Sequence, residues 1–509
     1  MSHKSRIHYS VLNSSISGGI YVLKMLAQFI SRSLFIYFLG KELLGLNGLF
    51  TSILNMLSLT ELGIGTSIIY SLYKPLNEKD DHQIKALMSL YKKIYTTIGI
   101  IVGILGLMLV PFLHIFIESA SEINGLYYYY ILFLLNSVIS YFFTYNRSLL
   151  NADQRSYISA INDFIFQLLV IIVQAFVLFL GKGYAFFLIV QIVGTLLSNI
   201  TISIRVNKEF HYLKDVPIMK LPKETVATLK KNTIGNLSSK IGQIIVNGTD
   251  SLLISIFVSL ASVGIYSNYF LIVSSVQQLC VQITNSITAS IGNVAVAGDE
   301  EHGFAVYKKH YFVSFSLLYF SSTSLMIALD PFIHLWLGSS YLLSKATMLA
   351  IVVNFIVKLF RQTPLVFIDA YGLAWIQRWK AIVESIANLT FSLLFLIVFD
   401  LGIVGVMLGT ILSSLMTVSW YEPYVVFKYG INKPFGTYLR ITSRYLLILL
   451  FTLLLTYSVN NQIEILGIVG LLIRLSVGLV IALLIYLIVF KNDDEFLSIM
   501  LIIKKLLKR

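Results

Sequence analysis

The chain alternates between long apolar stretches and short polar segments. Because a helix needs about 20 mainly apolar residues to cross the hydrocarbon core of a bilayer, each long stretch is a candidate membrane-spanning helix. The pattern predicts fourteen spans: Val11–Phe38, Leu43–Tyr73, Ile94–Ile117, Leu126–Leu150, Tyr157–Leu180, Tyr184–Ile204, Thr233–Val258, Val263–Val296, Tyr311–Leu329, Ala346–Ile368, Ala381–Phe399, Ile403–Val426, Ile441–Val459 and Leu466–Phe490. The predicted fold class is an all-α integral membrane protein.

Lysine and arginine residues are distributed unequally between the loops. Most loop bases lie in the amino terminus and in every second loop, whereas the intervening loops hold only Lys41, Lys182 and Lys345. Basic loops face the cytoplasm in multi-pass membrane proteins, so both termini are predicted to be cytoplasmic. We expect no cleavable signal peptide, because the first apolar stretch is too long for one.

The polar positions of the first predicted span recur in the seventh. Ser17, Tyr21, Lys24, Gln28 and Ser31 follow one face of a helix. A shift of 219 residues places them on the polar positions of the seventh span, which are Asn236, Lys240, Gln243, Asn247 and Asp250. The repeat predicts two pseudo-symmetric six-helix bundles of the same orientation, an arrangement typical of transporters with a substrate path between the halves.

The repeat and the loop lengths define the predicted organisation of the chain. A first six-helix bundle over 1–204 is followed by a cytoplasmic linker over 205–232 and a second bundle over 233–426. Two extra helices occupy 427–490. The tail over 491–509 alternates apolar and basic positions, as expected for an amphipathic helix on the inner membrane face.

Composition supports the membrane assignment and excludes other classes. The 509 residues are 57% hydrophobic and 12% charged, and the mean hydropathy is +0.81, which is incompatible with a soluble enzyme. The formal net charge of +13 is explained by the basic loops, so no nucleic-acid partner is expected. No nucleotide-binding P-loop or zinc-protease motif is present, and we predict neither a cofactor nor enzyme activity.

Ionisable and amide side chains within the spans are candidates for function, because charges are costly in the hydrocarbon core. The predicted lining of a water-filled, net-positive cavity between the halves comprises Lys24, Gln28, Arg32, Lys240, Gln243, Asn247, Gln278, Lys358 and Arg361. We favour function for Lys24, Lys358 and Arg361, since polar stripes extend their helix faces. For Arg32, Lys240 and Glu61, a static ion pair or a side chain reaching the interface explains the charge equally well.

Acidic residues within the spans are assigned to two groups. Asp250 and Glu61 are candidates for gating or cation coupling, and Asp250 is predicted to pair with Arg32 at an outer gate. Asp163 and Glu384 lie near predicted cytoplasmic span ends and are expected to be ordinary interface residues. We expect the same of His114, His310 and His334, which form no cluster with metal-ligand spacing.

The segment Phe38–Leu76 carries a family resemblance. Its opening reads L-G-x-x-x-x-G-L-x-x-L-F, and the motifs T-E-L-G-I-G and Y-K-P-L follow. In combination these motifs resemble the second-helix signature of bacterial polysaccharide flippases, the Wzx-type branch of the MOP superfamily that also holds MATE exporters and lipid II flippases. By this resemblance, Lys24 and Arg32 correspond to the basic positions of the first helix in the superfamily.

The resemblance implies a function in the bacterial plasma membrane. It implies translocation of undecaprenyl-pyrophosphate-linked oligosaccharide by alternating access, for capsule, exopolysaccharide or a related surface polymer. The implied partners are this lipid-linked substrate, membrane lipid, and the polymerase and glycosyltransferases of the same pathway. Two alternatives stay open, a cation-coupled MATE-like multidrug exporter and a membrane polysaccharide polymerase. Interior bases outnumber interior acids, against the exporter, and the short predicted outside loops argue against the polymerase.

Overall fold

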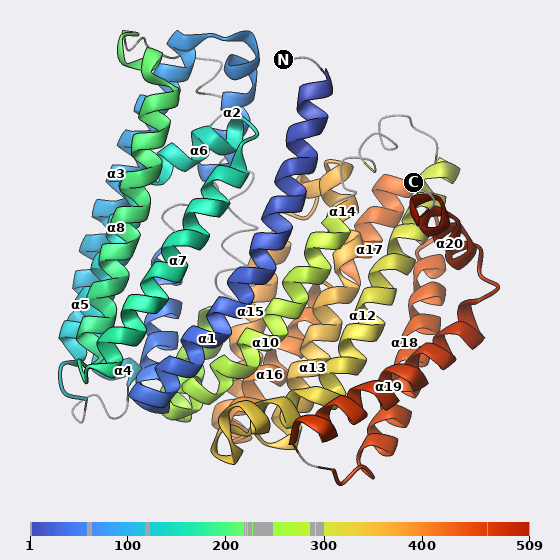
Figure 1. The fold of residues 1–509 in the computed structure, drawn as a ribbon. Helices are drawn as coiled ribbons and strands as arrows, with labels where there is room; N and C mark the ends of the chain where they lie inside the picture. The colour runs from blue at the N-terminus through green and yellow to red at the C-terminus, as the bar shows by residue number, and fades with distance from the viewer. Residues whose placement is uncertain are drawn as a thin grey trace. The chain divides into compact units, whose positions relative to one another are not determined.

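The computed structural model describes residues 3–58, 64–117, 123–217, 219, 221, 226, 248–285, 291, 300–465 and 467–507 (Figure 1). Within these ranges the regular structure is helical, without a β-strand. Ten helices are long and apolar enough to cross a membrane, or eleven if one bent pair counts as a single span. The all-α membrane fold is therefore confirmed. The count of fourteen stays a prediction, because the predicted spans over 233–258 and 263–296 lie partly outside the described residues.

The chain divides into two compact units, Met1–Gly264 and Ile265–Arg509. The helices of the first unit are α1 (His3–Leu57), α2 (Ile64–Glu78), α3 (Asp81–Leu109), α4 (Leu113–Phe116), α5 (Leu126–Tyr141), α6 (Thr144–Ala152), α7 (Ser156–Phe179) and α8 (Tyr184–Glu209). A short apolar helix, Gly248–Phe257, follows, and α10 (Leu260–Asn285) crosses the boundary between the units. The predicted linker over 205–232 lies outside the described residues beyond 217, except at 219, 221 and 226.

The second unit contains the remaining helices. They are α12 (Glu300–Leu337), α13 (Lys345–Phe360), α14 (Gln362–Ala370), α15 (Lys380–Leu393), α16 (Gly402–Thr417), α17 (Tyr421–Val425), α18 (Phe435–Asn460), α19 (Gly467–Phe490) and α20 (Asp494–Leu507). Short π-helical turns continue α15 over Leu394–Val398 and α17 over Val426–Ile431. The predicted amphipathic tail is thus a helix, and Glu495 at its start pairs with Lys308 of α12 at 3.0 Å. Its position on the membrane surface stays a prediction.

The first two predicted spans meet at a sharp backbone break. Gly40 has φ 79° and ψ −179°, so α1 consists of two helices on either side of this residue. Residues with a side chain rarely adopt this backbone conformation, whereas glycine adopts it without a steric penalty. The short predicted outer loop around Lys41 is therefore a one-residue turn.

Helix boundaries support the repeat of 219 residues. α3 begins at Asp81 and α12 begins at Glu300, which are 219 positions apart. The same shift places α5 (Leu126–Tyr141) on α13 (Lys345–Phe360) without an offset at either end. After a break, α5 is followed by the nine-residue helix α6, and α13 is followed by the nine-residue helix α14. The two units therefore share one bent-helix motif, as the pseudo-symmetric prediction requires.

Apolar packing and aromatic contacts hold the first unit together. α7 packs against α1 and α8, while α5 packs against α3 and α8 (Figure 1). Phe35 lies edge-on to Tyr184 with ring centroids 5.6 Å apart, and the buried Tyr130 hydroxyl donates to the Gly106 carbonyl at 3.1 Å. Because its hydroxyl group forms a hydrogen bond, a tyrosine can be buried in a helical core without an unpaired polar atom.

Tyrosine hydroxyls also attach α18 and α19 to α12 in the second unit. The Tyr319 hydroxyl is 2.8 Å from Thr452 Oγ1 of α18 and donates to the Ala482 carbonyl of α19 at 2.9 Å. The Tyr486 hydroxyl of α19 is 2.6 Å from Ser316 Oγ of α12. These contacts make the two helices beyond the repeat an integral part of the second unit.

One histidine lies in an environment that the sequence does not predict. His310 is 2% exposed, with Nδ1 2.9 Å from Thr363 Oγ1 and Nε2 3.2 Å from the Thr284 carbonyl. His310 is therefore buried between helices and is not the ordinary interface residue that was expected. His114 and His334 are exposed, and their place at the membrane interface stays a prediction. The ring links α12 to α10 and α14, and its two bonds explain why a polar ring can be buried there.

Candidate functional site

A polar cluster in the first unit is built around Lys24, midway along α1. Lys24 Nζ lies 3.9 Å from Asp163 Oδ2 on α7. The other carboxylate oxygen, Asp163 Oδ1, accepts a hydrogen bond from Arg147 Nη1 on α6. Three helices therefore place two bases around one carboxylate.

The guanidinium of Arg147 is held by further contacts. Its Nη2 donates to Ser198 Oγ at 3.1 Å and to Asn199 Oδ1 at 3.0 Å, both on α8. Ser198 in turn accepts from Asn162 Nδ2, at 2.8 Å to its hydroxyl and 3.2 Å to its carbonyl. Because these contacts come from α7 and α8, the orientation of Arg147 is fixed independently of Lys24.

The charges of this cluster do not balance. Two bases share one acid, which leaves one excess positive charge. The three side chains are 22–36% exposed, so the cluster is accessible rather than sealed. Two buried atoms beside it, Asn199 Nδ2 and Ser159 Oγ, have no hydrogen-bond partner in the described part of the chain. An anionic ligand at this cluster would compensate the excess positive charge.

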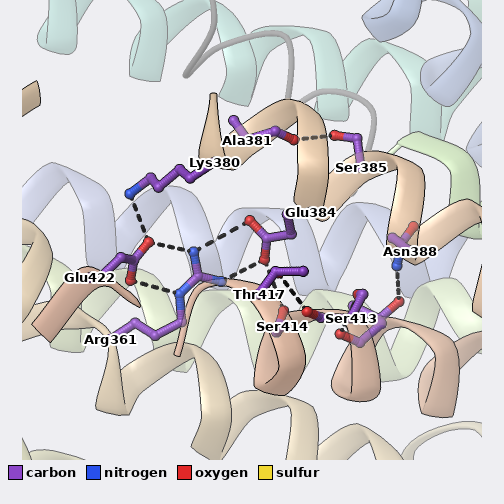
Figure 2. A network of polar contacts seen from close by, with 11 residues as sticks. Arg361, Lys380, Ala381, Glu384, Ser385, Asn388, Ser413, Ser414, Thr417 and Glu422 are labelled. Atoms are coloured by element: carbon purple, nitrogen blue, oxygen red, sulfur yellow. Dashed lines mark hydrogen bonds and ion pairs between the residues drawn. The ribbon is translucent and has the colours of Figure 1, made fainter. Parts of the chain in front are cut away.

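The second unit holds a larger and more buried charged network, drawn in Figure 2. Arg361, at the break between α13 and α14, donates from Nε to Glu422 Oε2 at 3.0 Å and from Nη2 to Glu422 Oε1 at 2.8 Å. Its Nη1 donates to Glu384 Oε1 of α15 at 2.8 Å. Lys380 Nζ adds a bond to Glu422 Oε1 at 2.7 Å.

Neighbouring hydroxyl groups complete this network. Ser414 Oγ of α16 donates to Glu384 Oε1 at 2.9 Å (Figure 2). Glu422 is fully buried, and the side chains of the other three charged residues are at most 14% exposed. Two bases and two acids cancel, and every charge has a hydrogen-bonded partner. Such a closed network has no spare charge for a ligand, and the loss of one partner would leave an uncompensated buried charge.

The two clusters occupy comparable places in the repeat. In each unit a basic residue of the bent helix pair contacts an acid on the next helix, Arg147 with Asp163 of α7 and Arg361 with Glu384 of α15. They differ in charge and exposure, since the first has an excess base and the second is neutral and buried. The first unit is therefore the one with a charge available for binding.

The structure also describes most of the other predicted site residues. Gln28 and Gln278 are exposed, Arg32 and Lys358 are half-buried, and Asp250 is 6% exposed. Glu61, Lys240, Gln243 and Asn247 lie outside the described residues. The pairing of Arg32 with Asp250 stays a prediction, and so do the binding roles of these residues.

Several charged residues of the clusters were missed by sequence reasoning. The interface placement expected for Glu384 is wrong, because its side chain is buried against Arg361. Arg147 and Glu422 lie inside the predicted spans over 126–150 and 403–426, and this alone marks them as costly charges. That criterion could have identified both residues, but only the packing of distant helices assigns their partners.

An open cavity of about 960 Å³ lies at one end of the first unit, next to the α2–α3 and α6–α7 turns. Tyr73, Lys74 and Leu76 of the Y-K-P-L motif line it. Arg155 also lines the cavity, with Nη2 2.6 Å from Asp153 Oδ2 and Nη1 paired with Glu209. Burial raises the pKa of Asp153 above its usual range despite the Arg155 guanidinium. Bases and acids are mixed in this lining, so it shows no excess of either charge.

Repeated bundles of helices that are long and apolar enough to cross a bilayer, with charged clusters inside them, define a multi-pass membrane protein. A family model described as polysaccharide biosynthesis protein matches residues 10–291, more than half of the chain. The chain belongs to this family, and the resemblance carried by Phe38–Leu76 is thereby confirmed. No curated protein matches the chain.

Solved transporters of the MOP superfamily share the fold. The lipid II flippase MurJ in an inward closed conformation is 15% identical, with a TM-score of 0.65 over 94% of this chain and 99% of that one. An inward-facing multidrug resistance MATE family transporter is 12% identical, with a TM-score of 0.63 over 81% and 98%. A MOP superfamily transporter from Pyrococcus furiosus, described as having a binding pocket of reversed polarity, is 13% identical with a TM-score of 0.52 over 83% and 95%.

Proposed function

We propose that this protein is a flippase that moves undecaprenyl-pyrophosphate-linked oligosaccharide units across the bacterial plasma membrane by alternating access. The polysaccharide biosynthesis family and the MOP-superfamily fold support a transported molecule of this class. The observation that carries the proposal is the excess positive charge at Lys24, inside a predicted span, where an uncompensated ammonium is costly. A pyrophosphate headgroup supplies the missing negative charge.

Lys24 is the proposed anchor for this headgroup. Its ammonium is 3.9 Å from Asp163, beyond the 2.7–3.2 Å typical of a hydrogen bond, so its donors remain available. The prenyl tail would stay in lipid while the headgroup crosses.

A cation-coupled multidrug exporter is the alternative with the same fold. A site for a cationic drug needs excess acid, as opposite charges are required to offset the loss of hydration. The cluster in the first unit has excess base and the network in the second is neutral. The charge balance of the described clusters therefore favours the anionic substrate.

The test is mass spectrometry of lipid-linked glycans in cells carrying Lys24→Ala as the sole copy. We expect the undecaprenyl-linked intermediate to accumulate and surface polymer to disappear, with the protein still present in the membrane. Lys182→Ala is the matched control and should leave output normal, because this exposed loop lysine lies over the Phe186 ring and forms no salt bridge with the described residues. Normal polymer from the Lys24→Ala strain would refute the proposed site.

A further inference from the structure

Asp163 stands between two bases that contact it unequally. Arg147 binds one carboxylate oxygen through a direct hydrogen bond. Lys24 lies 3.9 Å from the other oxygen, too far for such a bond. Among the described residues, Asp163 is the acid that reaches either base, so its position decides how much positive charge each base retains.

The scaffold around Arg147 explains why the carboxylate is drawn to one side. Ser198 and Asn199 of α8 accept from Nη2, which directs Nη1 towards Asp163. Asn162, adjacent to Asp163 on α7, ties the same helix to Ser198. Lys24 is on α1 and shares none of these bonds. The hydrogen-bonded side of the cluster thus holds the acid, and Lys24 Nζ lies 3.9 Å from it.

We propose that Arg147 is a positioning residue for headgroup binding: it holds Asp163 away from Lys24 and so keeps the Lys24 ammonium available to an anionic phosphate headgroup. This inference rests on the proposed function. A charge-assisted hydrogen bond is about twice as strong as a neutral one, so a carboxylate bound directly to Lys24 would compete with the substrate. The Arg147–Asp163 pair prevents this competition.

Removal of Arg147 has a specific consequence under this arrangement. In Arg147→Ala, Asp163 loses its partner and forms a direct ion pair with Lys24, which is already within 3.9 Å. The lysine is then neutralised and the site loses its affinity for anions. Replacement of the acid as well, in Arg147→Ala/Asp163→Asn, removes the competitor and frees Lys24 again.

The experiment measures binding of undecaprenyl pyrophosphate to the purified full-length protein in detergent, together with its unfolding temperature. We expect Lys24→Ala and Arg147→Ala each to bind at least about tenfold more weakly, the loss typical of one charged hydrogen bond. The double variant should regain most of the affinity. Asp163→Asn alone should bind at least as tightly as the unmodified protein, which keeps the inference testable if Arg147→Ala does not fold.

The unfolding temperature separates positioning from a merely structural bridge. If Arg147 only supports the fold, Arg147→Ala should lower the unfolding temperature together with the affinity, and the double variant should restore both. If Arg147 acts through Lys24, Arg147→Ala should lose affinity while still folded, and the triple variant Lys24→Ala/Arg147→Ala/Asp163→Asn should fold and lose the binding that the double variant regains. Normal binding by Arg147→Ala, or weaker binding by a folded Asp163→Asn variant, overturns the positioning role alone. Normal binding by Lys24→Ala overturns the proposed headgroup site itself.

Discussion

Gly45 and Gly264, which the repeat relates by a shift of 219 residues, lie directly against each other in the first unit. A Cβ atom on Gly45 would be 2.0 Å from the Leu260 carbonyl oxygen and 3.2 Å from Gly264 N. A Cβ atom on Gly264 would be 2.2 Å from the Lys41 carbonyl oxygen and 3.1 Å from Gly45 N. Lys41 and Leu260 are also 219 positions apart, so the contact is reciprocal. Gly45 belongs to the L-G-x-x-x-x-G-L motif, and this close backbone approach is the physical reason for its glycine.

The first prediction concerns this glycine contact. Gly45→Ala and Gly264→Ala should each lower the free energy of unfolding by about 1–3 kcal/mol, because the methyl group forces two helix backbones apart. The unfolding temperature in detergent measures the effect. Gly19→Ala is the matched control, since a Cβ there meets nothing within 4 Å, and it should be neutral or slightly stabilising. Equal behaviour of all three variants would contradict the close contact.

A second prediction addresses the buried network of the second unit. Glu422→Gln removes the carboxylate shared by Arg361 and Lys380 and should cost about 3–5 kcal/mol, as expected when one partner of a buried ion pair is lost. Thermal unfolding and the amount of protein in the membrane report this loss. Glu464→Gln changes the same chemical group at an exposed position and should have little effect. An unchanged unfolding temperature for Glu422→Gln would show that the network does not form.

The third prediction tests the attachment of α18 and α19. Tyr319→Phe removes the hydroxyl that contacts Thr452 and the Ala482 carbonyl, leaving the ring in place. The expected cost is about 0.5–1.5 kcal/mol per lost hydrogen bond, measured by thermal unfolding. Tyr127→Phe, at an exposed tyrosine, serves as the control and should leave stability unchanged. A Tyr319→Phe protein as stable as the unmodified one would argue against these hydrogen bonds.

The fourth prediction concerns topology. The single cysteine, Cys280, is replaced by serine, and cysteines are introduced at two exposed lysines outside the predicted spans, Lys182 and Lys208. In intact cells, a membrane-impermeant maleimide should modify Lys182→Cys and spare Lys208→Cys, because basic loops remain in the cytoplasm. After lysis both should react. The opposite labelling pattern would invert the predicted orientation.

Hydrophobicity alone was sufficient to locate most of the helices. The span predicted over 157–180 corresponds to α7 (Ser156–Phe179), and the span over 466–490 corresponds to α19 (Gly467–Phe490). The agreement has a physical cause, because apolar side chains stay in lipid and a helix satisfies its backbone hydrogen bonds within one segment. Local signals outside the apolar core also extend helices. Asp80 caps α3 by accepting from the Gln83 amide at 2.9 Å, well before the apolar stretch at Ile94.

The candidate site was predicted only in part. Lys24 is identifiable from the sequence as a charge deep in an apolar span, and so is Arg147 by the same criterion. Their common acid is Asp163, 139 positions after Lys24 and 16 after Arg147, and nothing in the local pattern connects the three. His310 shows the same limit, since its burial depends on Thr284 and Thr363 from other helices.

The sequence by itself determined which segments form spanning helices and which of them the repeat relates. It also determined that the chain is a membrane protein with basic loops and that it belongs to the polysaccharide biosynthesis family. These properties follow from composition, periodicity and motifs, each of which acts within one segment. The tertiary structure alone decided which charges are paired. It neutralised Arg361 with Glu384 and Glu422 and left Lys24 with a distant, shared carboxylate. Ion pairing depends on distances of a few ångströms between separate helices, and those distances arise only when the helices pack.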